Sequence, residues 1–358
     1  MRFVPDSCIR ENMVLAVNLY DKDESLLLKK GSVLKQNQIQ AIHQLGLSGI
    51  YIEDQISSDI KINTMISEEL KIKALSGIKN IFINDYNGSD LTQSMDEIKF
   101  IVETIINQIL STDNLLYNMV DLKLFDEYTY YHSLNVAVIS TIMGISLGYN
   151  RTTLYNLGLA AILHDIGNIF IPKHILIKQS SLTQEEHRKI RAHSFLGYAF
   201  IKDNYPNIAT SSYMGILHHH EHCNGSGYPF GLKKNKIHTF GKIISIADVF
   251  DSLTSDRPYR SAILPSDAME YIMGGADSLF DMELVKIFTR RVAPYPLGTC
   301  VRLSNQRIGI VVKNFPDCCT RPRVRLINKK TNKITNEYIN LKDDMHTTNI
   351  TIIEVVNI

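Results

Sequence analysis

The chain has 358 residues, a length that allows two or three domains with a substantial core. Its formal net charge of +1 gives no electrostatic argument for DNA, RNA or a membrane surface, so none of these is expected as a partner. The five cysteines form no CxxC pair and no zinc-site spacing, which favours reduced thiols in a cytoplasmic protein.

The first part of the chain alternates short strand-like runs with turn signals. The runs "MVLAVNLY" and "LLLKKGSVL" flank the polar "DKDES", and the helical "QNQIQAIHQLGL" precedes the β-branched "IYIE". We therefore expect a small α+β module over residues 1–60. The N-terminal residues lack the apolar run of a signal peptide, so export is not expected.

From about residue 67 onward, apolar residues recur at spacings of three and four, as in "EELKIKALSGIKNIFI" and "LTQSMDEIKFIVETIINQILST". Residues 61–120 are predicted to form a helical linker and the start of a bundle, and residues 121–292 the bundle itself. Its longest apolar stretch, Leu134–Tyr149, contains Asn135 and falls short of the about 18 to 20 apolar residues of a membrane span, so we expect a buried helix and no membrane span.

The last part of the chain changes character again. Strand candidates "TCVRLSN", "IGIVVKNF" and "RVRLINK" are separated by turns rich in Asn, Pro and Lys. Residues 293–358 are therefore predicted to form a small β-rich appendage. The predicted fold class is mainly α, a helical bundle with small β-rich segments at both ends.

The segment HDIGN at residues 164–168 places a histidine and an aspartate side by side where an apolar helix ends. Consecutive helical residues point about 100° apart, so His164 and Asp165 cannot share one apolar stripe unless a polar partner lies between them. A divalent metal is such a partner, because an unpaired buried carboxylate is costly. The alternative is an ordinary helix end that Gly167 terminates and whose dipole the histidine suits.

Four further segments place imidazole or carboxylate on apolar helices. His132 opens the helix after "DEYTYY", and His193 lies about two turns into a helix that begins with a capping box, "TQEE". The triplet 218–220 ends another helix, and Asp248 interrupts "GKIISIADVF". Each has an ordinary explanation as a cap or a buried polar residue. Because five such elements are hard to explain independently, metal binding is the favoured interpretation.

These motifs resemble those of the HD-GYP family, a branch of the HD-superfamily metal-dependent phosphohydrolases whose active members cleave cyclic di-GMP. The resemblance rests on HDIG at 164–167, HHE at 219–221, GYP at 227–229 and "ADVFDSLTSDRPYR" at 247–260, and it covers roughly residues 100–292. It implies an HD-type helical bundle carrying a metal site. The implied metal ligands are His132, His164, Asp165, His193, His219, His220 and Asp248.

Seven nitrogen and oxygen ligands are too many for one ion, so two divalent metals are expected, with Asp165 as the natural bridge. Ligands without thiolate favour iron or manganese, and zinc and cobalt stay open. Two ions about 3.5 to 4 Å apart can activate a water for attack on a phosphodiester phosphorus. The resemblance supports Arg257 and Arg260 as phosphate-binding residues, the alternative being a solvated face.

The loop "NGSGYP" presents Tyr228, which either binds substrate at the mouth of the site or packs within a tight turn. In the family this loop is also implicated in contacts with diguanylate cyclase domains. Asn168 stands where the family usually has a lysine that is expected to contact the scissile phosphate, so a cation is lost and a hydrogen-bond donor kept. Tyr128 stands where some members have a glutamate for a third ion, which favours two metals.

The resemblance implies hydrolysis of cyclic di-GMP to pGpG, with GMP as a further product, and Asp165 and Asn168 at the catalytic centre. Two alternatives stay open. One is a cyclic dinucleotide receptor with little turnover because of Asn168, and the other is a phosphodiesterase for another cyclic dinucleotide such as cyclic GMP-AMP. The sequence leaves the oligomeric state open, with a homodimer among the options.

Overall fold

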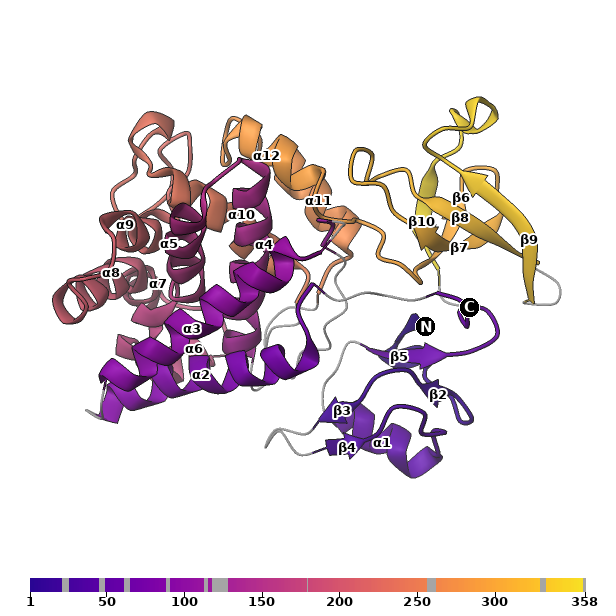
Figure 1. The fold of residues 1–358 in the computed structure, drawn as a ribbon, viewed down its shortest axis with the longest axis horizontal. Coiled ribbons are helices and arrows are strands. Elements are labelled where there is room, and N and C mark those ends of the chain that lie inside the picture. Colours follow the sequence, from indigo (N-terminus) through magenta and orange to yellow (C-terminus); the bar gives the residue numbers. More distant parts are fainter. Residues whose placement is uncertain are drawn as a thin grey trace. The chain divides into compact units, whose positions relative to one another are not determined.

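The computed structural model describes residues 1–20, 26–44, 49–60, 65–87, 91–112, 115–117, 128–178, 180–255, 262–328 and 333–356. The chain divides into two compact units (Figure 1). The first comprises residues 1–64, 118–128 and 292–358, and the second comprises residues 65–117 and 129–291. The division into segments 1–60, 61–120, 121–292 and 293–358 stays a prediction.

The N-terminal part of the first unit is a small α+β structure. Its elements are β1 (Arg2–Pro5), η1 (Asp6–Cys8), β2 (Val14–Leu15), β3 (Leu19–Tyr20), β4 (Leu26–Leu28), α1 (Gln36–Gln44) and β5 (Gly49–Glu53). Antiparallel strands form a sheet in the order β1-β5-β2, and β3 pairs with β4. Leu15, Ile42 and Ile50 are completely buried in its core. The sequence patterns predicted neither β1 nor η1, and the run "MVLAVNLY" contains two short strands, β2 and β3.

The C-terminal part of the first unit is an antiparallel sheet in the order β10-β6-β7-β8-β9. Its elements are β6 (Cys300–Leu303), β7 (Ile308–Lys313), β8 (Arg323–Asn328), β9 (Lys333–Asn340), η5 (Met345–Thr347) and β10 (Ile352–Val355). Ile60 packs in one apolar cluster with Ile310 and Ile327. Two guanidinium nitrogens of Arg325 donate to the Asp59 carboxylate, each at 2.6 Å. The end of the N-terminal part therefore packs directly on this sheet.

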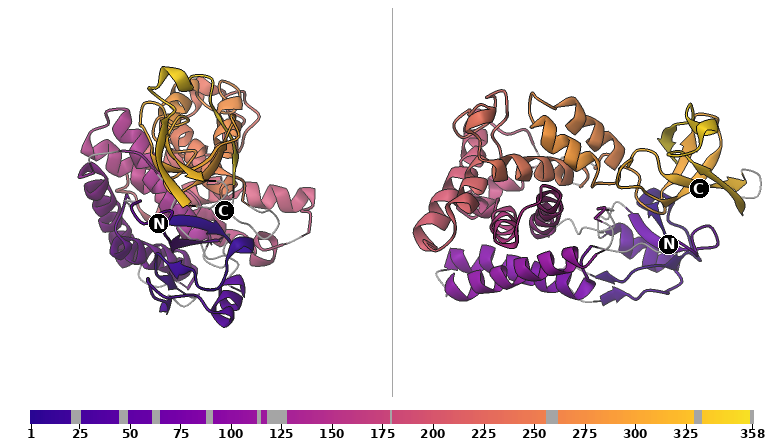
Figure 2. Two further views of the ribbon diagram at one scale, coloured as in Figure 1. Left: turned by 90° about the vertical axis from the view of Figure 1, so that its right-hand side faces the viewer. Right: turned by 45° about the horizontal axis from the view of Figure 1, so that its top comes forward.

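The second unit is helical. Its elements are α2 (Glu68–Asn87), α3 (Leu91–Leu110), α4 (Tyr128–Ser146), α5 (Arg151–Ile162), η3 (Ile166–Phe170), α6 (Lys173–Leu176), α7 (Gln184–Arg191), α8 (His193–Asn204), α9 (Thr210–His218), η4 (Lys234–Lys236), α10 (Thr239–Leu253), α11 (Pro265–Gly274) and α12 (Met282–Thr289). The long helices α2 and α3 lie side by side (Figures 1 and 2), and α9 packs against α5, α8 and α10.

Helix spacing explains the core of this unit. In α3, Ile98, Ile101 and Ile105 recur at steps of three and four and are at most 1% exposed. A helical unit with small β-rich segments outside it confirms the predicted fold class. Among the described residues, no helix combines the length and the apolar character needed to cross a membrane.

The contact between η3 and α8 depends on Gly167. This glycine does not terminate a helix, because α5 ends earlier, at a cap on Leu163, and the φ of Gly167 is not positive. Instead, the backbone of η3 lies so close to α8 that a Cβ on Gly167 would overlap the carbonyl oxygen of His193 and lie 2.7 Å from the Gly197 amide nitrogen. The missing side chain allows η3, which directly follows Asp165, to lie against the first residues of α8.

We expect Gly167→Ala to destabilise the second unit by about 3 kcal/mol, because the added methyl group meets backbone that cannot rotate away. Urea unfolding of the full chain measures the change. Gly274→Ala is the matched control, since nothing lies within 4 Å of its added Cβ, and it should shift the free energy of unfolding by about 1 kcal/mol or less. Equal stability of the two variants would show that the close approach is not required.

Candidate metal centre

The structure brings together all seven side chains predicted as metal ligands. His132 lies on α4, His164 and Asp165 follow the end of α5, and Asp248 lies on α10. His219 and His220 directly follow α9. These residues form three sets, and within each set the ligand atoms all lie within 4.8 Å of one another. The sets are Asp165, His193, His219 and His220; His132, His164 and Asp165; and His164, His219 and Asp248.

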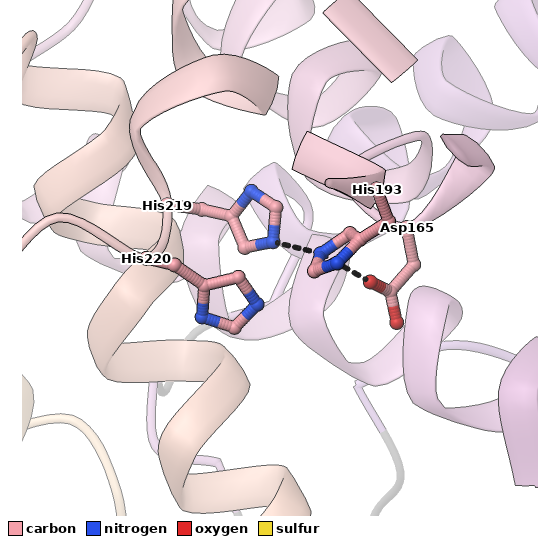
Figure 3. A group of neighbouring side chains, drawn as sticks. All are labelled: Asp165, His193, His219 and His220. Carbon is pink, nitrogen blue, oxygen red and sulfur yellow. Dashed lines mark hydrogen bonds and ion pairs between the residues drawn. The ribbon is translucent and has the colours of Figure 1, made fainter. Parts of the chain in front are cut away.

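His193 reaches the cluster differently from the predicted way. The capping box of Thr183 and Glu186 is present, but α7 ends at Arg191, and His193 is the first residue of the separate helix α8. The side chain is 3% exposed and faces Asp165 and His219 (Figure 3). A break between the two helices therefore turns His193 toward the other ligands.

Asp165 connects two groups of histidines. Its Oδ1 lies 3.3 Å from Nε2 of His193. Its Oδ2 lies 3.6 Å from Nε2 of His164 and 3.9 Å from Nε2 of His132. Because each carboxylate oxygen faces a different group, the geometry suits the bridging role expected for this residue.

Main-chain carbonyls fix the tautomers of three histidines. Nδ1 of His164, His193 and His219 donates to the carbonyl oxygen three residues earlier, at 2.8, 2.7 and 2.6 Å respectively. A carbonyl oxygen can only accept, so the proton of each neutral imidazole lies on Nδ1. Each Nε2 atom therefore presents a lone pair to the interior of the cluster, as a metal ligand must.

Among the described residues, no donor faces the inward Nε2 lone pairs of His164, His193 and His219. Nε2 of His193 and Nε2 of His219 lie 3.1 Å apart (Figure 3), although both atoms are acceptors in the tautomers described. Nε2 of His164 is buried and has no hydrogen-bond partner among the described residues. Two nitrogens bound at right angles to one ion, each at about 2.1 Å, would be about 3 Å apart. The donor set therefore fits a divalent metal.

A buried carboxylate positions His132. Asp251 is 1% exposed, and one of its oxygens accepts from Nδ1 of His132 at 2.8 Å. Its other oxygen accepts from the Asn135 amide at 3.0 Å. This carboxylate directs Nε2 of His132 toward Asp248, which lies 3.2 Å away. Sequence reasoning gave Asp251 no role, although it follows Asp248 by three residues and so shares its helix face.

Burial and charge oppose each other in the cluster. Burial by itself would lower the pKa of His132, but hydrogen bonds to Asp248 and Asp251 raise it to about 9. Burial would raise the pKa of Asp165, yet the surrounding imidazoles, His164 first, hold it well below its usual range. Burial lowers the pKa of His220 to about 3. His220 is therefore neutral at pH 7, whereas His132 must lose a proton before Nε2 can bind a metal.

Of the four other predicted site residues, the structure describes Tyr228 and Asn168. Tyr228 lies against the cluster, since its ring stacks on His220 with centroids 4.6 Å apart and an interplanar angle of 28°. Asn168 is half-buried in η3, and its backbone N–H donates to the Asp165 carbonyl at 2.9 Å. Arg257 and Arg260 lie outside the described residues.

Two neighbours of the ligand pair shape the loop that carries Tyr228. Glu221 is 2% exposed and accepts from the backbone N–H groups of Phe230 and Leu232, at 2.8 and 2.7 Å. Nδ1 of His218 accepts from the backbone N–H of His238 at 3.0 Å, which ties it to the start of α10. Sequence reasoning used Glu221 only to align HHE and assigned it no contact.

Comparison with known proteins supports an HD architecture. Residues 114–284 match the model of a family described as "HD domain", and residues 300–358 match a "KOW domain associated with HD domain". A cyclic di-GMP phosphodiesterase of Pseudomonas aeruginosa is 31% identical over 273 residues, which cover 75% of this chain and 66% of that protein. A cyclic di-GMP phosphodiesterase of Thermotoga maritima is 30% identical over 230 residues, covering 62% of each chain.

A related protein named for another substrate also matches. A "3'3'-cGAMP-specific phosphodiesterase" of Vibrio cholerae is 34% identical over 209 residues, which cover 58% of this chain and 42% of that protein. The chain thus spans less than two thirds of the length of these curated relatives. A solved "HDG"Y"P protein" of Bdellovibrio bacteriovorus aligns with a TM-score of 0.50 at 17% identity, covering 79% of this chain and 96% of that one. This likeness shows the fold alone.

We expect Mn(II) binding at pH 7.5 to release about one proton, because His132 with a pKa of about 9 starts protonated and must bind as neutral imidazole. In the metal-free protein, the interactions of protonated His132 with Asp248 and Asp251 also stabilise the fold. This stabilisation is complete below the ordinary histidine pKa of 6.5 and is lost as the pH rises through about 9. Titration calorimetry in two buffers of different ionisation enthalpy counts the protons.

Asp251→Asn provides the comparison, since loss of one neighbouring carboxylate lowers the pKa of His132 and should reduce proton release at the same pH. Release that is equal in both proteins, or absent in both, would argue against a protonated His132 in the metal-free state.

Proposed function

We propose that the helical unit, in which residues 129–284 match the HD domain family, is a metal-dependent phosphodiesterase that hydrolyses cyclic di-GMP to pGpG. The observation that carries the proposal is the pair of inward Nε2 lone pairs on His193 and His219, 3.1 Å apart and adjacent to the two-sided Asp165 carboxylate. Relatives at 30 and 31% identity are cyclic di-GMP phosphodiesterases, which supports this substrate.

We propose two divalent ions, iron or manganese, on ligand chemistry. One would be held by Asp165, His193, His219 and His220, and the other by His132, His164, Asp165 and Asp248. Ions held there would supply Lewis acidity and lower the pKa of a water directed at the phosphorus. The five cysteines are free thiols, in keeping with the cytoplasmic location that we also propose.

The chain's own residues would position the metal ions and the water. Asp165 offers one oxygen to each histidine group, and Asp251 keeps the Nδ1 proton on His132 so that Nε2 faces inward. Burial of the imidazoles excludes bulk water, which strengthens every electrostatic interaction within the site.

Polar groups at the edge of the metal centre would contact the scissile phosphate of the substrate. Burial raises the pKa of Tyr228 above its ordinary value, so its hydroxyl keeps its proton and can donate to a phosphate oxygen. Asn168 would donate a second hydrogen bond from its amide. Arg257 and Arg260 would neutralise phosphate charge with their guanidinium groups, as the family resemblance implies.

Purified full-length protein loaded anaerobically with Fe(II) or Mn(II) is expected to convert cyclic di-GMP to pGpG, as followed by chromatography of the products. Asp165→Ala should abolish turnover because it removes the carboxylate oxygens from both histidine groups. Cyclic GMP-AMP is assayed as a second substrate of the same protein, since a relative at 34% identity is named as specific for that nucleotide. Cleavage of cyclic GMP-AMP alone would replace the proposed substrate, and cleavage of neither would refute the phosphodiesterase.

Asn168→Lys restores the cation that the family usually carries and should raise turnover by about 10-fold or more if charge at this position limits the reaction. Asn168→Ala is the matched control, because it removes the amide without adding charge. If the wild-type protein binds cyclic di-GMP tightly without cleaving it, while Asn168→Lys cleaves it, the receptor function is favoured. Equal rates for wild type and Asn168→Lys would exclude Asn168 as the limiting feature.

A further inference from the structure

One face of α7 lines a hollow beside the candidate metal centre. Within the part of the chain that the structure describes, its walls are Gln184, His187, Arg188 and Arg191, and its volume is about 330 Å³. These positions follow the spacing of three and four that places side chains on one helix face. The described walls of the hollow therefore belong to a single capped helix.

No described carboxylate forms an ion pair with the two arginines of this face. Both acidic residues of α7 are paired elsewhere: Glu185 with Lys189 on its own helix at 3.0 Å, and Glu186 with Lys178 at 2.7 Å. Arg188 and Arg191 are exposed and form no ion pair with any described carboxylate. Two guanidinium groups are thus available to an anion that enters the hollow.

The hollow adjoins the metal centre through Tyr228. The guanidinium carbon of Arg191 lies 5.4 Å from the centroid of the Tyr228 ring, and the same ring stacks on His220. Arg191 also lies two residues before His193, at the break between α7 and α8. An anion held by Arg191 would therefore be separated from the proposed ligands by a single aromatic ring.

We propose that Arg191, assisted by Arg188, binds the second phosphate of a cyclic dinucleotide, the one that is not cleaved in that turnover. The inference rests on the proposed function, because such a substrate carries two phosphates and only one can lie over the metal ligands. The other negative charge needs a partner within one nucleotide's reach of the centre. Among the described residues, the α7 face supplies two unpaired cations there, in a form that suits bidentate phosphate binding.

The first test is equilibrium binding of cyclic di-GMP to metal-free full-length protein, a state without turnover. Arg191→Ala and Arg188→Ala should each weaken binding, by about 10-fold or more for Arg191. Lys189→Ala is the matched control, because it removes one positive charge from the same helix at a side chain that pairs with Glu185 outside the hollow. It should bind within about 2-fold of the wild type. Circular dichroism checks that the helices are retained.

Kinetics with metal-loaded protein give a readout that a purely structural role would not move. Arg191→Ala should raise KM for cyclic di-GMP more than it lowers kcat, and the loss should be smaller for bis(p-nitrophenyl) phosphate, which has one phosphate. Arg191→Lys should recover part of the affinity, since it restores charge without the planar fork.

The outcomes separate this inference from the proposed function. If wild-type protein binds and cleaves cyclic di-GMP while Arg191→Ala behaves as Lys189→Ala does, the phosphodiesterase stands and the role of α7 is wrong. Equal losses for one-phosphate and two-phosphate substrates would also overturn it, because they would place Arg191 at the scissile phosphate. If the wild type neither binds nor cleaves a cyclic dinucleotide, the proposed function fails and this inference fails with it.

Discussion

The second unit depends on hydrogen bonds from imidazole Nδ1 atoms to main-chain carbonyls and a buried carboxylate. These bonds decide which nitrogen of His164, His193 and His219 carries the proton, and they leave the Nε2 acceptors of His193 and His219 facing one another at 3.1 Å. Such an arrangement costs free energy unless a cation occupies it. The helices around it must therefore supply enough packing to hold like atoms together, and the fully buried Phe250 and Phe288 indicate how that is done.

Five of the seven proposed ligands lie at helix ends, whereas His132 and Asp248 lie within α4 and α10. His164 and Asp165 follow α5, His193 begins α8, and His219 and His220 follow α9. Side chains at helix ends can point along the helix axis, which allows several helices to aim at one volume without their backbones colliding. Gly167 and Gly241 mark close approaches of two segments, since an added Cβ at Gly241 would lie 2.6 Å from the Cβ and 2.9 Å from the carbonyl carbon of His218. Small residues in the second unit thus set the spacing on which the ligand geometry depends.

Sequence predicted the helical class and the convergence of the ligand residues, because apolar periodicity and isolated polar residues are both local signals. It did not predict contacts between distant segments. Asp251 and His132 are 119 positions apart, so their hydrogen bond could not be read from spacing. The close approach at Gly167 and the arginines on one face of α7 were also missed, because they depend on how close two segments come and on which charges are already paired. The strands β9 and β10 carried no clear alternation and were not foreseen.

The contacts of Glu221 bear on how this architecture could be re-engineered. Its carboxylate accepts from Phe230 and Leu232, and the neighbouring His218 accepts from the backbone of His238. The tyrosine loop, the residues beside the histidine pair and the N-cap residue of α10 are consequently linked by hydrogen bonds. A graft of the loop alone into another protein would leave the backbone N–H groups of Phe230 and Leu232 without their acceptor. The shortest segment that keeps these hydrogen bonds and the one to His218 is therefore residues 218–238. Variation among homologous loops is expected to be confined to side chains that point away from this carboxylate.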